Sequence, residues 1–290
     1  MTVAPGTQTE QRFALSDSDR RRMRTNRIML RIIQVATFVA VLPVFLILIA
    51  ILAKGLGTLD LAFLVNNPLD EQVGIANAIK GSLAMTGIAL LISAPIGIAA
   101  AIFLNEYAST AVQRIGDTLV DILLGVPSIV AGLFIFLLVV PALGYNGYAG
   151  ALALSVLMTP VVIRTTQEVL RLVPAGLREA SLALGVPMWR TTIFVTCRTA
   201  LSGILTGLVL ALSRGIGETA PLLLTAQGSN DSVIDLGAPL SSMTIVIYNN
   251  TISSDPIKFA QAWTCALVLF AIALTLNVLI RFKTINSRVL

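Results

Sequence analysis

VPAGLREASLALGVPMWR (residues 173–190) stands between two apolar stretches, the second of which contains RGIGETAP (residues 214–221). Pro174 suits the first turn of a short helix, where its missing N–H is not needed, and Gly185 suits the left-handed position just past the end of that helix. Small and apolar residues recur between them at helical spacing on one face: Leu177, Ala180, Ser181 and Leu184. The stretch therefore predicts a short helix that another surface approaches closely.

The composition excludes a soluble domain. The chain has 290 residues, of which 56% are hydrophobic and 12% are charged, whereas about a quarter of the residues in soluble domains are charged. The net charge of +5 does not indicate nucleic-acid binding, because the basic residues flank apolar stretches and form no basic face. We therefore expect an integral membrane protein in contact with lipid, with no nucleic-acid partner.

The chain has six apolar stretches, and the first, at about 29–52, exceeds the roughly 20 residues that a bilayer crossing takes. A basic tail, residues 1–27, precedes a membrane domain at residues 28–290. Only Lys54, Lys80 and Lys258 fall outside, so the positive-inside rule places the N- and C-termini in the cytoplasm. The expected fold is all-α, with six transmembrane helices at about 29–52, 76–103, 117–140, 148–163, 200–226 and 259–280.

Several chemistries lack the residues they need. The chain has no histidine, the commonest metal ligand and neutral-pH proton shuttle. It also has no Gly-x-x-x-x-Gly-Lys-Ser/Thr phosphate loop, and no pairing of a nucleophile with a base indicates an enzyme. We expect no catalytic residue, no metal site and no cofactor bound by this chain, so any ATP would act on a partner.

Arg214 is the most informative charged residue. It lies about fifteen residues into the fifth expected span, where a charge costs roughly 2.5–3.5 kcal/mol and should face the bundle interior or water. Glu218 follows four residues later on the same expected helix face. Glu218 neutralises the charge of Arg214, lowers the affinity of Arg214 for a passing anion, or does both. Arginine suits phosphate because its planar fork donates paired hydrogen bonds and stays charged.

Two motifs carry a family resemblance. Glu179-Ala180-Ser181, followed after three residues by Gly185, resembles the EAA loop of ABC-importer permeases, and residues 214–221 resemble the phosphate-transport members of that family. Residues 95–107 and 124–132 also resemble segments of those members. The resemblance implies the type I ABC importer permease fold (MetI-like) and a permease subunit that moves inorganic phosphate by alternating access.

The resemblance also implies sites and partners. It assigns the loop at 171–198 to ATPase coupling, and it adds Arg164 to Arg214 and Glu218 on the substrate path. The implied partners are a second homologous permease subunit, two P-loop ATPase subunits that hold ATP and Mg²⁺, and an extracytoplasmic phosphate-binding protein. The implied location is the bacterial cytoplasmic membrane. Within the loop, the resemblance assigns four residues to coupling: Glu179, Ala180, Ser181 and Gly185.

Two alternative functions stay open at this stage. An importer of another oxyanion, such as molybdate or sulfate, would have the same spacing of motifs. A proton-coupled secondary anion carrier would use Asp117, Asp121 and Glu218, and its sign would be an inverted internal repeat, which we do not see. Asp117 and Asp121 lie one turn apart near the expected start of the third span, where the helix dipole tolerates negative charge. A simple interfacial acid pair is therefore the preferred interpretation.

Overall fold

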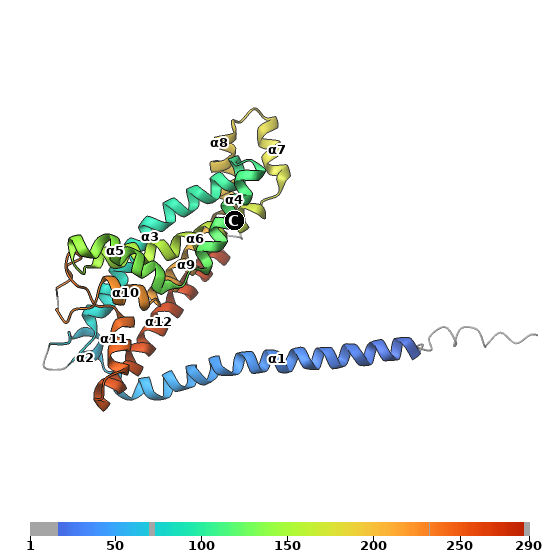
Figure 1. Ribbon diagram of the computed structural model, residues 1–290. Helices are drawn as coiled ribbons and strands as arrows, with labels where there is room; N and C mark the ends of the chain where they lie inside the picture. Colours follow the sequence, from blue (N-terminus) through green and yellow to red (C-terminus); the bar gives the residue numbers. More distant parts are fainter. Residues whose placement is uncertain (1–16, 70–72, 232, 287–290) are drawn as a thin grey trace, which may run out of the picture. The chain divides into compact units, whose positions relative to one another are not determined.

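The computed structural model describes residues 17–69, 73–231 and 233–286, which are mostly helical. Within them no strand forms, and one isolated bridge joins Gln227 to Leu240. The helices appear in Figure 1. They are α1 (Asp17–Gly55), η2 (Leu56–Thr58), α2 (Leu61–Val65), α3 (Ala76–Ile102), η3 (Phe103–Tyr107), α4 (Thr110–Gly125), α5 (Ser128–Leu143), α6 (Gly147–Arg171), α7 (Ala175–Ala183), α8 (Met188–Arg190), η4 (Thr191–Cys197), α9 (Arg198–Ile216), α10 (Ala220–Thr225), α11 (Met243–Thr251) and α12 (Pro256–Asn286).

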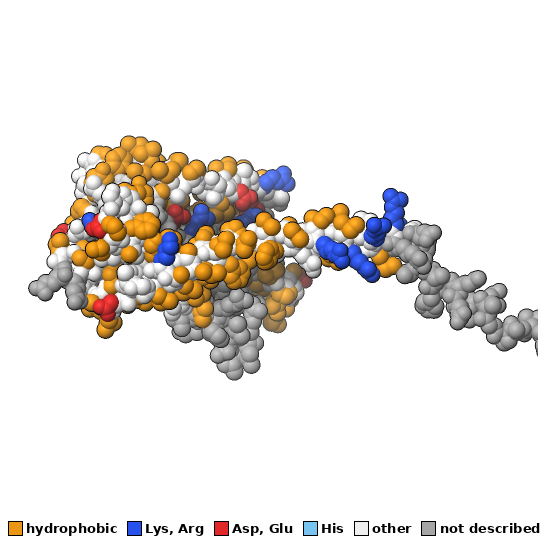
Figure 2. All heavy atoms as spheres, turned by 90° about the horizontal axis from the view of Figure 1, so that it is seen from below, with side chains coloured by type: hydrophobic (Ala, Val, Ile, Leu, Met, Phe, Trp, Pro, Cys, Tyr) orange, Lys and Arg blue, Asp and Glu red, His pale blue; other side chains and the backbone are white. Residues whose placement is uncertain are grey.

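The chain divides into two compact units, Met1–Ala53 and Lys54–Leu290. The described part of the first unit is helix α1, whose side chains at 21–47 are all exposed. Figure 2 shows hydrophobic side chains along α1 and Lys and Arg side chains toward its beginning. Apolar side chains on every side of a helix are typical of a membrane span. The helix begins at Asp17, ahead of the expected span at 29–52, and residues 1–16 of the expected tail lie outside the described residues.

Helix α6 forms the centre of the second unit. In its most apolar 18-residue window, 72% is buried, against 22–28% for the corresponding windows at 76–107, 188–216 and 256–278. Its neighbours α3, α9 and α10 contribute Met85, Ala211 and Leu222 to the core around Leu154 and Met158 of α6. Because the outer helices keep apolar side chains exposed, this unit presents a hydrophobic surface around a packed centre.

Glycines allow the closest helix contacts in this core. A Cβ at Gly97 of α3 would lie 2.7 Å from Cγ1 of Val162 on α6. A Cβ at Gly132 of α5 would lie 2.5 Å from Cα of Pro221 on α10. Both distances are shorter than van der Waals contact, so these positions accept no side chain without movement. Small residues therefore permit close helix packing in this fold.

The number of membrane-crossing helices agrees with the six-span prediction. Five helical segments are long and apolar enough to cross a membrane, and α4 with α5 makes a sixth if the bent pair counts as one span. The protein is therefore an all-α, multi-pass membrane protein.

The short helices lie at the two ends of the second unit. Helices α7 and α8 lie together at one end, while α2 and α11 lie at the opposite end (Figure 1).

The third span differs from its prediction. The sequence suggests one helix at 117–140, but α4 and α5 meet at an angle of 95°. Proline has no N–H for a helix hydrogen bond and forces the preceding residue into an extended conformation. Accordingly, Val126 has φ −65° and ψ 127°, and Pro127 precedes the first turn of α5. Prediction of a continuous span was wrong because the proline ends the helix instead of kinking it.

The fifth span differs from its prediction as well. Instead of one helix at 200–226, α9 ends at Ile216 and α10 follows after a short turn. Gly217 ends α9, and Pro221 lies in the first turn of α10, where its missing N–H is harmless. The fourth and sixth helices extend past their expected ends at 163 and 280. Helix α11 lies between the fifth and sixth expected spans.

Candidate functional site

The turn between α9 and α10 holds the first candidate pair, Arg214 and Glu218. The N–H of Gly217 donates to the carbonyl of Arg214 at 3.2 Å, and the N–H of Glu218 donates to the carbonyl of Gly215 at 3.2 Å. From α11, the hydroxyl of Thr244 donates to the carbonyl of Glu218 at 2.9 Å. These three bonds fix the backbone that carries both charged side chains.

Arg214 occupies the last turn of α9, where the helix dipole favours a positive charge. Glu218 lies past the end of the helix, so the expected pairing along one continuous helix face was wrong, yet the two side chains still meet. The Nε of Arg214 lies 3.7 Å from Oε1 of Glu218, and the side chains are 43% and 17% exposed. That separation exceeds a hydrogen bond, and within the described residues the Arg214 side chain makes none. The guanidinium therefore keeps its donors for another acceptor.

Arg164, on α6, also lies near carboxylates without a side-chain hydrogen bond to them. Its Nη1 lies 3.7 Å from Oδ1 of Asp121, and its Nε lies 3.6 Å from Oε1 of Glu168. By contrast, Arg171 and Arg178 donate hydrogen bonds to carboxylates at 2.9 and 2.8 Å. Among the ion-paired arginines of the described chain, the two that the sequence assigns to the path are the two without a hydrogen bond.

Arg164 and Arg214 lie at different levels along the contact between α6 and α9. The two helices run antiparallel, which the positions of close approach show: Gly203 with Val169, Gly207 with Thr165, and Gly215 with Met158. Arg214 is thus level with a residue about five positions before Arg164, which is roughly 7.5 Å along the helix axis. The structure places the two arginines along one helix pair and does not bring them into a single pocket.

The acids of α4 pair with α6. Asp117 accepts hydrogen bonds from Nε2 of the fully buried Gln167 at 2.8 Å and from Nη2 of Arg171 at 2.9 Å. Asp121 pairs with Arg164. Because α4 begins at Thr110, neither acid lies in the first turn, and the expected role for the helix dipole was wrong. Sequence spacing could not reveal these pairs, because they join residues far apart in the chain.

The predicted short helix is present as α7, and its end has the expected geometry. Gly185 has φ +79°, and the N–H of Val186 donates to the carbonyl of Ser181 at 3.2 Å, which closes the left-handed helix end. Ser181 is buried and its hydroxyl lies 2.8 Å from that of Thr191. Glu179 and Ala180 are exposed. Of the four residues assigned to coupling, Ser181 holds α7 in place and the other three face outward.

Apolar side chains surround the outward face of α7. Three of them, Leu172, Leu184 and Trp189, are 80%, 84% and 52% exposed. Leu177 and Leu184 were expected on one face with Ser181, but only Ser181 is buried. This end of the molecule therefore offers an apolar surface with a charged Glu179 on it. Such a surface suits a protein partner better than water.

The comparisons with known proteins identify the family. The model of the family described as "Binding-protein-dependent transport system inner membrane component" matches residues 93–284. The chain belongs to this family. All the candidate residues of this inner membrane component, from Arg164 to Glu218, lie within the matched region.

Close relatives cover most of the chain. A phosphate transport system permease protein PstA from Pasteurella multocida is 40% identical over 260 residues, which is 88% of this chain and 93% of the relative. One from Xylella fastidiosa is 43% identical over 243 residues, covering 81% and 83%. PstA 1 from Mycobacterium tuberculosis is 36% identical over 262 residues, covering 86% of each chain. The chain therefore groups with permeases of this name.

Solved structures show the fold. The inward-facing MetNI methionine ABC transporter matches with a TM-score of 0.58 at 22% identity, covering 73% of this chain and 94% of that one. A bacterial alginate ABC transporter matches with a TM-score of 0.62 at 16% identity, covering 88% and 93%. The family member described here therefore has the type I ABC importer permease fold.

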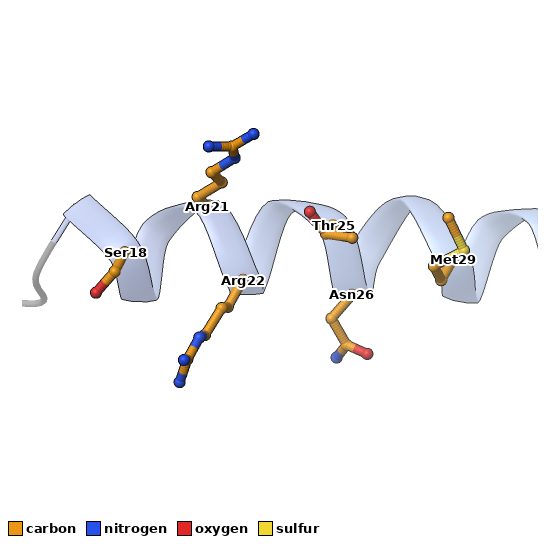
Figure 3. Close-up of a pocket in the computed structure, with 6 residues that line it drawn as sticks. All are labelled: Ser18, Arg21, Arg22, Thr25, Asn26 and Met29. Carbon is orange, nitrogen blue, oxygen red and sulfur yellow. The ribbon is translucent and has the colours of Figure 1, made fainter.

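Two hollows are lined by none of the candidate residues of this family member. One runs along α1 and is lined by side chains of that helix alone, with Arg21 and Arg22 pointing to opposite sides (Figure 3). A second, of about 440 Å³, lies at the end of the molecule opposite α7, where Lys258 joins amides such as Asn249 and Asn250. Within the described residues, no cluster of acids and cysteines suits a metal. Arg164 and Arg214, each of which lies near a carboxylate, remain the candidate anion contacts.

Proposed function

We propose that this chain is a membrane-spanning subunit of an ATP-driven ABC importer for inorganic phosphate. The observation that carries the proposal is the identity of 36–43% to relatives named phosphate transport system permease PstA over 81–88% of the chain. The availability of Arg214 and Arg164 for hydrogen bonds supports it. Their side chains lie in a helix pair where a tetrahedral oxyanion finds charge-assisted donors.

The geometry fits brief contact with an anion and not tight capture. Glu218 lies 3.7 Å from Arg214, and both Asp121 and Glu168 lie within 4 Å of Arg164. Each carboxylate reduces the local positive potential, so a phosphate at either arginine is held weakly and leaves quickly. High affinity would then reside in a separate extracytoplasmic phosphate-binding protein. The arginines would serve as successive contacts along the path.

The proposed complex contains a second homologous permease, two P-loop ATPase subunits and that binding protein. The ATPase subunits hold ATP and Mg²⁺ and receive α7 with its exposed Glu179, Ala180 and Gly185. Their closure moves α7, and the movement opens the path alternately to each side. The N- and C-termini and the segment 171–198 lie in the cytoplasm, and the protein resides in the bacterial cytoplasmic membrane. This chain performs no hydrolysis itself.

The contacts of α4 count against the proton-coupled alternative. Asp117 accepts two hydrogen bonds, one of them from a guanidinium, and Asp121 faces Arg164. Both acids are thus engaged by side chains of α6. Their contacts suit the attachment of α4 to α6.

Uptake by the reconstituted complex tests the proposal. The chain is placed in proteoliposomes with its partner permease, the ATPase inside and the loaded binding protein outside. We expect uptake of labelled phosphate that needs ATP, persists when a protonophore removes the proton gradient, and is not replaced by uptake of molybdate or sulfate. Uptake that stops with the protonophore supports the carrier instead. Uptake of another oxyanion in place of phosphate would identify a different substrate.

A further inference from the structure

Arg178 extends from α7 into the protein instead of toward a partner. Its Nη2 donates to Oε1 of Glu106 at 2.8 Å and to the carbonyl of Leu170 at 2.9 Å, and its Nη1 donates to the carbonyl of Val173 at 3.4 Å. Glu106 belongs to η3, at the end of the long helix α3, and Leu170 belongs to the last turn of α6. One side chain therefore ties α7 to two of the long helices.

The Arg178–Glu106 contact is largely shielded from water. The Glu106 side chain is 6% exposed and the Arg178 side chain 24%. Nδ2 of Asn105 also donates to Oε1 of Glu106 at 2.7 Å. A buried ion pair is weak evidence for stability, because well-packed apolar side chains in its place are often as stable or more so. A directional role explains its placement better than a contribution to stability alone.

Two further polar contacts link α7 and η3 to η4. The hydroxyl of Ser181 on α7 lies 2.8 Å from that of Thr191 on η4. The hydroxyl of Tyr107 on η3 donates to that of Thr192 on η4 at 3.3 Å. Both η3 and η4 are π-helical, a rare geometry that is frequent at functional sites. Helix α7 is thus held by polar contacts on its inner side while its outer side stays exposed.

Helix α3 leads from this contact toward Arg214. Thr86 lies twenty residues before Glu106, a distance of about 30 Å along a helix. A Cβ at Gly215, the neighbour of Arg214, would lie 3.2 Å from Cγ2 of Thr86. One end of α3 with η3 therefore contacts α7, and the other part contacts the residue beside the candidate anion contact.

We propose that Arg178 and Glu106, here called the inner latch, are positioning residues that make α3 move with α7. The inference rests on the proposed function, since it explains how movement of α7 by an ATPase reaches Arg214. The latch joins α7 to α3, and α3 carries the displacement to the turn after Gly215. Neither latch residue contacts the substrate.

The deciding variant is the double change Arg178→Met with Glu106→Leu. Apolar side chains of similar size leave no unpaired buried charge, so we expect the complex to assemble and the ATPase to respond to the loaded binding protein. Phosphate moved per ATP hydrolysed should fall about tenfold, within the usual range of coupling between sites. Arg178→Lys keeps the charge without the planar fork and should give an intermediate ratio. A wild-type ratio in the double variant would overturn the latch.

Asp117→Asn is the matched control. It neutralises one partner of an ion pair of 2.9 Å that joins α4 to α6 without contact to α7. We expect its ratio of phosphate to ATP to stay within about twofold of wild type, as for most partly exposed ion pairs. An equal loss in Asp117→Asn and in the double variant would show a general effect of charge removal and would also overturn the latch.

A distance measurement separates the latch from the choice of substrate. Spin labels at the exposed positions Leu182 of α7 and Leu91 of α3 are introduced into a cysteine-free complex. In the wild-type background, the distance between the two labels should have one narrow distribution with and without ATP. In the double latch variant, ATP should shift or broaden it, and an unchanged distribution would overturn the latch. If wild type hydrolyses ATP but moves no phosphate, the proposed substrate is wrong, and the distance measurement still decides the latch.

Discussion

Replacing Gly132 with alanine should disturb the candidate site without touching its charged residues. The new Cβ would lie 2.5 Å from Cα and 3.1 Å from Cβ of Pro221. Carbon atoms in contact are about 3.5–4.0 Å apart, so α5 and α10 would have to separate by at least roughly 1 Å. The obstacle is backbone, which no rotamer change relieves. Because Pro221 follows Glu218 by three residues, the separation displaces the turn that holds Arg214 and Glu218.

Such overpacking costs about 1–3 kcal/mol, and a displacement of about 1 Å at a functional group lowers its rate by up to about two orders of magnitude. We therefore expect Gly132→Ala to lower the thermal midpoint of the purified complex and to reduce phosphate uptake per assembled complex at least tenfold. Gly87→Ala is the control, because nothing lies within 4 Å of its added Cβ. Alanine there raises helix propensity by about 1 kcal/mol. Equal midpoints and uptake in the two variants would refute the contact between α5 and α10 as the support of the site.

Three further changes test other parts of the account. Gly185 has φ +79° and open space around it, so Gly185→Val should cost about 1–2 kcal/mol through the backbone alone and should lose ATP-driven uptake. Asparagine tolerates this conformation, so Gly185→Asn should keep most of the uptake. Equal uptake in the two variants would remove the end of α7 from coupling. A cysteine at the exposed Leu182, in an otherwise cysteine-free chain, should not react with an impermeant thiol reagent outside intact cells, and labelling there would reverse the topology. Asp117→Ala leaves Nε2 of buried Gln167 without its acceptor and should lower the free energy of unfolding by about 1–3 kcal/mol. Arg171→Ala should lower it by at most about 1 kcal/mol. Equal changes in thermal midpoint would contradict the claim that Asp117 matters more for its bond to Gln167 than for its ion pair with Arg171.

Local signals in the sequence predicted the helix α7 well. A proline before the helix and a glycine after it act within a few residues, so Pro174 and Gly185 define its ends without help from the rest of the fold. The apolar spans were also predictable, because the bilayer imposes a length and a composition on each. These features need no knowledge of which helices touch.

The features that the sequence missed depend on tertiary contacts. Pro127 was visible, but a proline in an apolar stretch kinks or ends a helix according to what packs around it, and here α4 and α5 turn by 95°. The pairing of Asp117 and Asp121 with α6, and of Arg178 with Glu106, joins residues 43 to 72 positions apart. Residues so distant in the chain are brought together by helix packing alone, which a single sequence does not encode in any readable spacing.

Phosphate uptake by Arg214 variants tests the central claim most directly. The reconstituted complex is compared in wild-type form and with Arg214→Lys, Arg214→Gln, and Arg214→Gln combined with Glu218→Gln, with uptake normalised to assembled complex. The account predicts partial uptake for lysine, which has charge without the planar fork, and almost none for either glutamine variant, although the neutral double variant assembles normally. Wild-type uptake by the neutral double variant would contradict the account, because neither charge would then contact the phosphate.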